Sequence, residues 1–211
     1  MTTNANLHKA KNTKYDEFYT QLKDIEKELI HYKKHFKDKI VYCNFDNPNK
    51  SAFWEYFHKN FTTLGLKRLI ATYRDVVNVP YVAIYVGGDD ENIAAYDKIA
   101  IQDGDFRSNS CSTLLSCADI VVTNPAFSLF RELVDLLMQK NKKFILLGSQ
   151  NSLTNKNIFS YVMKNQLWTG VNCGNMWFKV PDSFPPRQNR YRMDGGGRSG
   201  AVSVISVGTP I

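Results

Sequence analysis

The chain has 211 residues, of which 43% are hydrophobic and 22% charged, and this composition is ordinary for one folded domain with a substantial core. Twenty-seven basic residues against 20 acidic ones give a net charge of +7, which favours polyanionic partners without identifying one. The sequence contains no apolar run of the roughly 18 residues that span a membrane and begins without the apolar core of a secretory signal, so we expect a cytoplasmic protein.

The amino-terminal quarter is predicted to contain a polar tail, a helix, a strand and a second helix. Residues 1–13 are polar and are expected to be disordered. From Asp16, apolar residues recur at helical spacing and predict an amphipathic helix, on the face formed by Phe18, Leu22, Ile25, Leu29, Tyr32 and Phe36. A first strand is expected over 39–46 and ends at Asn47 and Pro48. Ser51 is then expected to cap a helix that carries Phe53, Trp54, Phe57 and Phe61.

The middle of the chain alternates short strands with helices. The strand patterns lie at 66–73, at 81–86 in an inserted hairpin, and at 99–106, 119–123 and 144–148. The helical patterns lie at 112–117 and 127–140. Alternation of this kind predicts an α/β fold with a doubly wound, mainly parallel sheet.

The end of the chain has a different composition. Residues 181–200 combine two adjacent prolines, a glycine run and several arginines, which is typical of a loop. Residues 201–208 alternate apolar and small polar side chains, and we expect them to pair with 172–180 as a carboxyl-terminal antiparallel hairpin.

Cysteine and histidine patterns do not predict a metal site or disulfides. The four cysteines form no Cys-x2-Cys pair and have no histidine nearby, so reduced thiols are expected. His31 and His35 have the spacing of a metal-binding helix, but lysines lie beside them and no glutamate stands in the required place between them. A solvated basic face is the favoured interpretation.

The most informative stretch is 118–130, Ala-Asp-Ile-Val-Val-Thr-Asn-Pro-Ala-Phe-Ser-Leu-Phe. It predicts a buried strand that brings a rigid Asn-Pro turn to the edge of the sheet, where open α/β sheets bind their ligands. Its tetrapeptide Asn-Pro-Ala-Phe at 124–127 differs at one position from Asn-Pro-Pro-Phe, a signature of methyltransferases that act on the amino groups of DNA bases. Four further segments occur in a characteristic order: Lys-Tyr-Asp-Glu-Phe-Tyr-Thr at 14–20, Val-Tyr-Cys-Asn-Phe-Asp-Asn-Pro at 41–48, Gly-Asp-Phe-Arg-Ser at 104–108 and Lys-Lys-Phe-Ile-Leu-Leu-Gly-Ser-Gln-Asn at 142–151. Together they resemble the EcoRI-type adenine-specific DNA methyltransferase family, over about residues 16–178.

The resemblance implies a Rossmann-like class I methyltransferase fold and an enzyme of restriction-modification systems or phage. It implies S-adenosylmethionine as cofactor, no metal, and double-stranded DNA whose adenine is flipped out and methylated at N6. The catalytic domain is expected at 14–181, and 182–211 is expected to hold an Arg/Gly-rich loop and the final strand. A region that recognises a specific DNA sequence is expected to be absent or truncated.

The resemblance also implies the catalytic residues. Asn124 would accept a hydrogen bond from the target amine through its side-chain oxygen, Pro125 would accept one through its carbonyl, and Phe127 would stack on the base. Taken alone, the tetrapeptide favours a plain turn with a core phenylalanine, and the other segments reverse this balance. Ala126 departs from the family pattern, because a proline there would restrain the backbone of Pro125.

Six residues are implied to hold the cofactor. By resemblance, Asn44 and Asp46 contact its amino-acid end, whereas Asp105 and Phe106 supply a polar acceptor and an apolar wall for its adenine. The amino-terminal contacts are Tyr19 and Thr20. The competing interpretations are an Asx-turn after the first strand and an aspartate in a hairpin turn. Asp75 is a weak candidate for binding the ribose.

Two other functions remain open from the sequence. One is an amino-methyltransferase of RNA or protein, and the other is a catalytically silent nucleic-acid-binding or regulatory module. For binding to DNA, phosphate contacts are expected from Arg187, Arg190, Arg192 and Arg198.

Overall fold

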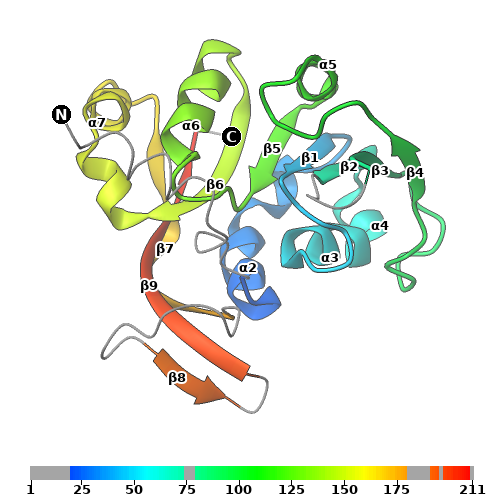
Figure 1. The fold of residues 1–211 in the computed structure, drawn as a ribbon, viewed down its shortest axis with the longest axis horizontal. Coiled ribbons are helices and arrows are strands. Elements are labelled where there is room, and N and C mark those ends of the chain that lie inside the picture. The colour runs from blue at the N-terminus through cyan, green and yellow to red at the C-terminus, as the bar shows by residue number, and fades with distance from the viewer. Residues whose placement is uncertain (1–19, 74–78, 180–190, 195–196, 210–211) are drawn as a thin grey trace.

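The computed structural model describes residues 20–73, 79–179, 191–194 and 197–209, and only the backbone for 173–177, 179, 191–194 and 197–208 (Figure 1). These residues build a nine-stranded sheet of order β4-β3-β2-β1-β5-β6-β9-β7, with β8 paired to β9. The strands are β1 Ile40–Asn44, β2 Arg68–Tyr73, β3 Tyr81–Tyr85, β4 Asp97–Ala100, β5 Ile120–Thr123, β6 Lys143–Ser149, β7 Trp168–Lys179, β8 Tyr191–Asp194 and β9 Gly197–Gly208.

The centre of the sheet is parallel and its flanks are antiparallel. β2, β1, β5 and β6 run in the same direction, as the alternation of strands and helices predicts. β9 pairs antiparallel with β6 and β7, which confirms the expected carboxyl-terminal hairpin. On the other side β3 and β4 add two antiparallel strands. The Rossmann-like, class I methyltransferase type of fold is therefore confirmed.

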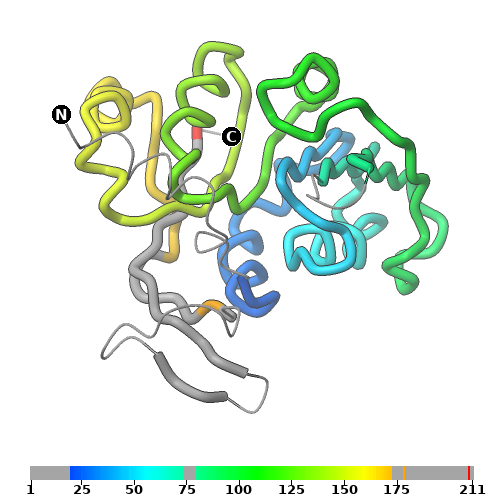
Figure 2. Tube along the Cα trace, viewed as in Figure 1, coloured from blue at the N-terminus to red at the C-terminus, as the bar shows by residue number. Residues whose placement is uncertain are grey.

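Helices cover both faces of the sheet (Figures 1 and 2). Their bounds are α2 Leu22–Leu29, η1 Ile30–His35, α3 Ala52–Lys59, α4 Phe61–Leu64, α5 Asn109–Cys117, α6 Phe130–Gln139, η2 Gln150–Thr154 and α7 Lys156–Met163. One core packs α2, α3 and α4 against Val41 and Cys43, and the other packs α5, α6 and α7 against Tyr42. Adjacent residues of β1 thus enter different cores, because side chains of a strand alternate between the two faces.

Several predicted boundaries shift in the structure. The helix expected over 16–36 becomes a 3-10 helix from Ile30 onward, a common way for a helix to end. The helix expected from Phe127 begins at Phe130, because the Leu129 amide closes a turn on the Ala126 carbonyl at 2.8 Å. Ser51 caps α3 as predicted, with its Oγ accepting from the Trp54 amide at 3.1 Å.

Two predictions near the edges of the sheet are wrong in part. The strand expected over 99–106 is β4, which ends at Ala100; beyond it the Asp103 side chain accepts from the Asp105 amide at 2.9 Å, and this local turn competes with strand pairing. The loop expected over 181–200 contains β8 and the start of β9. There, pairing with neighbouring strands overrides a glycine-rich composition. Residues 180–190 lie outside the described part of the chain.

A buried carboxylate joins the amino-terminal helix to β7. The pairing of β7 with β9 shifts register between Thr169 and Cys173, and this irregularity frees backbone amides. Glu28 of α2 accepts hydrogen bonds there from the Val171 amide at 3.0 Å and the Asn172 amide at 2.7 Å. The helix that follows Thr20 is therefore fixed to the sheet. Among the described residues, none of the helices has the length and hydropathy needed to cross a bilayer.

Candidate active site

The order of the strands reverses between β1 and β5, and this switch point lies beside both predicted functional turns. From β1 the chain moves to β2 on one side, whereas β5 and β6 lie on the other side. Ligands of open α/β sheets bind outside the carboxyl ends of the strands at such a point. The structure brings the turn after β1, with Asn44 and Asp46, next to the turn after β5, with Asn124 and Pro125.

Asp46 and Thr123 connect the two turns directly. Thr123 Oγ1 lies 2.6 Å from Asp46 Oδ2 and also contacts the carbonyl oxygen of Asn44. On the other side, Ser51 Oγ donates to Asp46 Oδ1 at 2.5 Å. Thr123 is fully buried and Asp46 is 6% exposed. Burial raises the pKa of Asp46 to about 7, although the hydrogen bonds from Ser51 and Thr123 lower it.

Asn44 belongs to a buried polar network that joins β1 to β2. Its side-chain oxygen accepts from Thr72 Oγ1 at 2.9 Å and from the Phe45 amide at 3.0 Å. Thr72 Oγ1 lies in turn 2.8 Å from the hydroxyl of Tyr42, whose pKa is raised by burial. The side-chain oxygen of Asn44 is thus engaged within the protein.

Phe45 adopts a left-handed backbone conformation, with a φ of +71°. A bulky residue in this region is strained, and such strain tends to occur at functional sites. The Phe45 ring packs against Phe106, with 5.3 Å between ring centroids. This contact holds the loop around Asp105 beside the turn that follows β1. Sequence reasoning missed Phe45, because a positive φ at phenylalanine has no local sequence signal.

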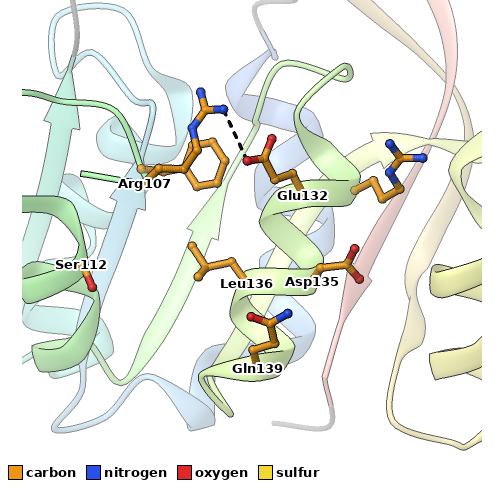
Figure 3. A pocket seen from close by; sticks show the side chains of 8 residues that line it. Arg107, Ser112, Glu132, Asp135, Leu136 and Gln139 are labelled. Atoms are coloured by element: carbon orange, nitrogen blue, oxygen red, sulfur yellow. Dashed lines mark hydrogen bonds and ion pairs between the residues drawn. The ribbon is translucent and has the colours of Figure 1, made fainter. Parts of the chain in front are cut away.

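Asp105 is held by a neighbouring arginine that sequence reasoning also missed. Arg107 Nε and Nη2 donate to the two carboxylate oxygens of Asp105 at 2.8 Å each, and the Arg107 amide donates to Oδ1 at 3.0 Å. Hydrogen bonding to Asp105 raises the pKa of Arg107. Arg107 Nη1 also lies 3.4 Å from Glu132 of α6 (Figure 3). The opposite charges of Asp105 and Arg107, two residues apart in the sequence, were the signal from which this ion pair could have been predicted.

A groove of about 540 Å³ lies between α5 and α6 next to this ion pair. Its lining includes both charges and apolar surface, from Phe106, Arg107, Ser112, Arg131, Glu132, Asp135, Leu136 and Gln139 (Figure 3). Phe106, the predicted adenine wall, therefore stands between the turn after β1 and this groove.

The Asn124 side chain meets the amino-terminal segment. Asn124 Nδ2 donates to Thr20 Oγ1 at 3.1 Å, and Thr20 immediately precedes the cap of α2. Pro125 is buried, whereas Asn124, Ala126 and Phe127 are half-buried. The structure thus brings Thr20 to the predicted catalytic turn.

Some predicted residues lie outside what the structure describes. These are Tyr19, Asp75, Arg187 and Arg190, and for Arg192 and Arg198 only the backbone in β8 and β9 is described. Among the described side chains, Cys43, Cys111 and Cys117 form no disulfide. Within the described ranges, no cluster of three or more His, Cys, Asp or Glu side chains has a geometry that would hold a metal ion.

Comparisons with known proteins agree with this arrangement. The family described as adenine-specific methyltransferase EcoRI matches residues 6–207. The Escherichia coli type II methyltransferase M.EcoRI is 42% identical over 217 residues, covering 92% of this chain and 64% of that protein. A type II methyltransferase of Mycoplasma genitalium is 36% identical over 205 residues, covering 90% of this chain and 60% of that protein.

A third relative, the type II methyltransferase M.MpnI of Mycoplasma pneumoniae, is 36% identical over 195 residues, covering 90% of this chain and 59% of that protein. The chain therefore spans about three fifths of the length of the relatives that it matches. The match to the family extends over all the strands that form the switch point. The chain belongs to the adenine-specific EcoRI methyltransferase family.

Proposed function

We propose that this chain carries the catalytic domain, residues 14–181, of an enzyme that transfers a methyl group from S-adenosylmethionine to N6 of adenine in DNA. The observation that carries the proposal is the position of Asn124 and Pro125. In a chain of this family they follow β5 at the switch point, beside the turn after β1. An acceptor-rich turn at that edge suits a reaction whose nucleophile is a weakly basic amine.

The residues at the switch point fit the cofactor by their chemistry. The turn formed by Asn44, Phe45 and Asp46 would lie beside its amino-acid end, where Tyr19 and Thr20 would also contact it. Asp105 supplies a carboxylate and Phe106 an apolar ring suited to adenine, and the tilted ring contact between Phe45 and Phe106 keeps these two places adjacent. When bound, S-adenosylmethionine supplies an electrophilic methyl group on a positively charged sulfur, and this chemistry requires no metal.

The protein's own contribution is to position the amine. The lone pair of an aromatic amine is delocalised into the ring, so accepting both N–H hydrogens increases its availability for attack. We assign one acceptor to the Asn124 side-chain oxygen and the other to the Pro125 carbonyl. Phe127 would stack on the base, which has to leave the double helix to reach this turn.

The net charge of +7 supports a nucleic-acid substrate. We assign phosphate contacts to Arg187, Arg190, Arg192 and Arg198, and we place the enzyme in the cytoplasm, where bacterial DNA lies. If these arginines bind phosphates, replacing each by glutamine should lower affinity for unrelated DNA sequences alike and make its salt dependence less steep. A loss confined to one sequence would contradict this assignment.

Transfer of a labelled methyl group tests the proposal. The chain is incubated with labelled S-adenosylmethionine and equal amounts of DNA, RNA or unrelated protein. The proposal predicts label in DNA. Label in RNA or protein instead would indicate the alternative amino-methyltransferase, and cofactor binding without transfer to any acceptor would indicate a silent module.

Cofactor binding is measured separately by calorimetry in the presence of a chelator. Binding should persist, and should also raise the melting temperature of the protein. Failure to bind at millimolar cofactor would contradict the cofactor assignment.

A further inference from the structure

The contacts around Asp46 require more protons than its ionised form provides. Three oxygen pairs lie in hydrogen-bonding contact: Ser51 Oγ with Asp46 Oδ1, Thr123 Oγ1 with Asp46 Oδ2, and Thr123 Oγ1 with the Asn44 carbonyl. Each pair needs one proton between its oxygens. A serine and a threonine hydroxyl supply two, because each has a single O–H donor.

A neutral Asp46 supplies the missing proton. In that form Asp46 Oδ2 donates to Thr123 Oγ1, Thr123 donates to the Asn44 carbonyl, and Ser51 donates to Asp46 Oδ1. Each of the three contacts then has one donor and one acceptor. With Asp46 ionised, Thr123 has to serve either the carboxylate or the carbonyl, and the other pair is left as two facing lone pairs.

The surroundings also favour the neutral form. Asp46 is 6% exposed, and burial raises its pKa more than the hydroxyl groups of Ser51 and Thr123 lower it; no charged side chain of the described residues contributes to this shift. The neighbouring titratable group is the Cys43 thiol on β1, whose own pKa is raised by burial and then by Asp46. Within the part of the chain that the structure describes, no cation thus stabilises a negative charge on Asp46.

The proton on Asp46 lies between the two turns of the candidate active site. Asp46 belongs to the turn after β1, and Thr123 is the last residue of β5, directly before Asn124. The chain of hydrogen bonds is thus a cross-connection between the turn beside the cofactor and the turn that presents the acceptors.

We propose that Asp46 is held as a neutral acid whose proton joins the turn after β1 to the end of β5, and that this link makes Asp46 and Thr123 positioning residues for Asn124. The positioning role rests on the proposed function, whereas the proton link does not. On ionisation Thr123 turns to the carboxylate, its contact with the Asn44 carbonyl is lost, and the end of β5 keeps only one of these two hydrogen bonds to the turn after β1.

The stability of the protein tests the proton link without any activity. Because the pKa of Asp46 in the folded protein is about 7 against an ordinary value of 3.8, the folded state binds the extra proton between these two values. Stability that depends on this proton is therefore present at the acidic end of the window and lost as pH rises through it. Asp46→Asn keeps a donor toward Thr123 and cannot ionise. Its melting temperature relative to the natural protein should rise by about 5–10 °C between about pH 5 and about pH 8.

Two measurements accompany the melting curves. Asp97→Asn is the matched control, since it removes the same charge from an exposed position on β4, and it should keep the natural pH dependence. In the unmodified protein labelled with carbon-13 at aspartate carboxyl groups, one resonance should titrate with a midpoint near 7 and be missing in Asp46→Asn.

The rate of methyl transfer tests the positioning role. Between about pH 6 and about pH 8, kcat of the natural protein and of Asp97→Asn should fall roughly tenfold relative to that of Asp46→Asn, as expected for one group titrating near 7. Thr123→Val should lower kcat by a larger factor than it changes the KM for the cofactor. Thr123→Ser, which keeps the hydroxyl group, should restore kcat.

Each result decides between parts of the proposal. Titration of every aspartate below about pH 5 would overturn the proton link. Titration near 7 with the same pH–rate profile in Asp46→Asn as in the natural protein would overturn the positioning role. Titration near 7 without methyl transfer at any pH would contradict the proposed function, and the positioning role with it, while the proton link stands.

Discussion

The amide group of Asn124 donates to the hydroxyl of Thr20, with 3.1 Å between Nδ2 and Oγ1, although the two residues are 104 positions apart. Because the nitrogen of the amide faces Thr20, the oxygen of the same amide points away from Thr20. Thr20 therefore selects the orientation in which Asn124 presents an acceptor. This orientation is the one that the proposed contact with the target amine requires.

Thr20→Val should lower kcat about 3–10-fold, because it removes one hydrogen bond worth roughly 0.5–1.5 kcal/mol and lets the amide turn. Steady-state kinetics measure this, with Thr20→Ser as the variant that keeps the hydroxyl and should stay close to the natural rate. An increase of KM for S-adenosylmethionine at unchanged kcat would instead make Thr20 a plain cofactor contact.

Asn124→Ala should abolish most of the methyl transfer and leave cofactor affinity within about twofold. One lost acceptor is expected to cost roughly 3 kcal/mol in the transition state, by analogy with the removal of an oxyanion-hole donor. Single-turnover rates and calorimetry give the two quantities. Asn109→Ala, at the exposed start of α5, is the control and should behave as the natural protein. Undiminished turnover in Asn124→Ala would move the active site elsewhere.

Ala126→Pro should raise both activity and stability. Ala126 makes no amide hydrogen bond within the described part of the chain, so proline removes no donor that is in use. The substitution would restrain Pro125 and restrict the unfolded chain, with a typical gain of about 0.4–1 kcal/mol in the free energy of unfolding. Denaturant melts and transfer rates measure both effects. A variant that is less stable and no more active would show that this backbone has left the family geometry.

Gly148→Ala should destabilise the protein by roughly 1–3 kcal/mol, because a Cβ atom at this position in β6 would lie 2.4 Å from the Phe130 ring. Phe130 is buried and begins α6, so the helix after the catalytic turn has to shift. A double-mutant cycle with Phe130→Leu checks the cause, since the smaller side chain should relieve much of the added cost. Additive losses would mean that the contact is not responsible.

Local patterns predicted the centre of the fold well. The apolar runs of β1, β5 and β6 were visible because these strands are buried on both faces. Ser51 was identifiable as a cap because capping depends on residues three positions apart. The strand at 201–208 was visible from its alternation of apolar and small polar side chains, and it pairs antiparallel with β7 as expected.

The geometry of the site depended on contacts that the sequence does not display. The pairing of Asp46 with Thr123 spans 77 positions and requires β1 and β5 to be neighbours. The left-handed backbone of Phe45 is held by tertiary packing against Phe106. Strand β8 forms by pairing with β9, although its composition is typical of loops. Local propensity carries no information on such contacts.

The most direct test of the central claim is the nucleoside composition of DNA after incubation with the protein and S-adenosylmethionine. Unmethylated DNA is treated with the natural chain or with Asn124→Ala, digested to nucleosides and analysed by mass spectrometry. We expect N6-methyladenine with the natural chain and at most a trace with the variant. Two results would contradict the proposed function. One is the absence of N6-methyladenine from DNA treated with a natural chain that binds the cofactor, and the other is an equal amount of it with both proteins.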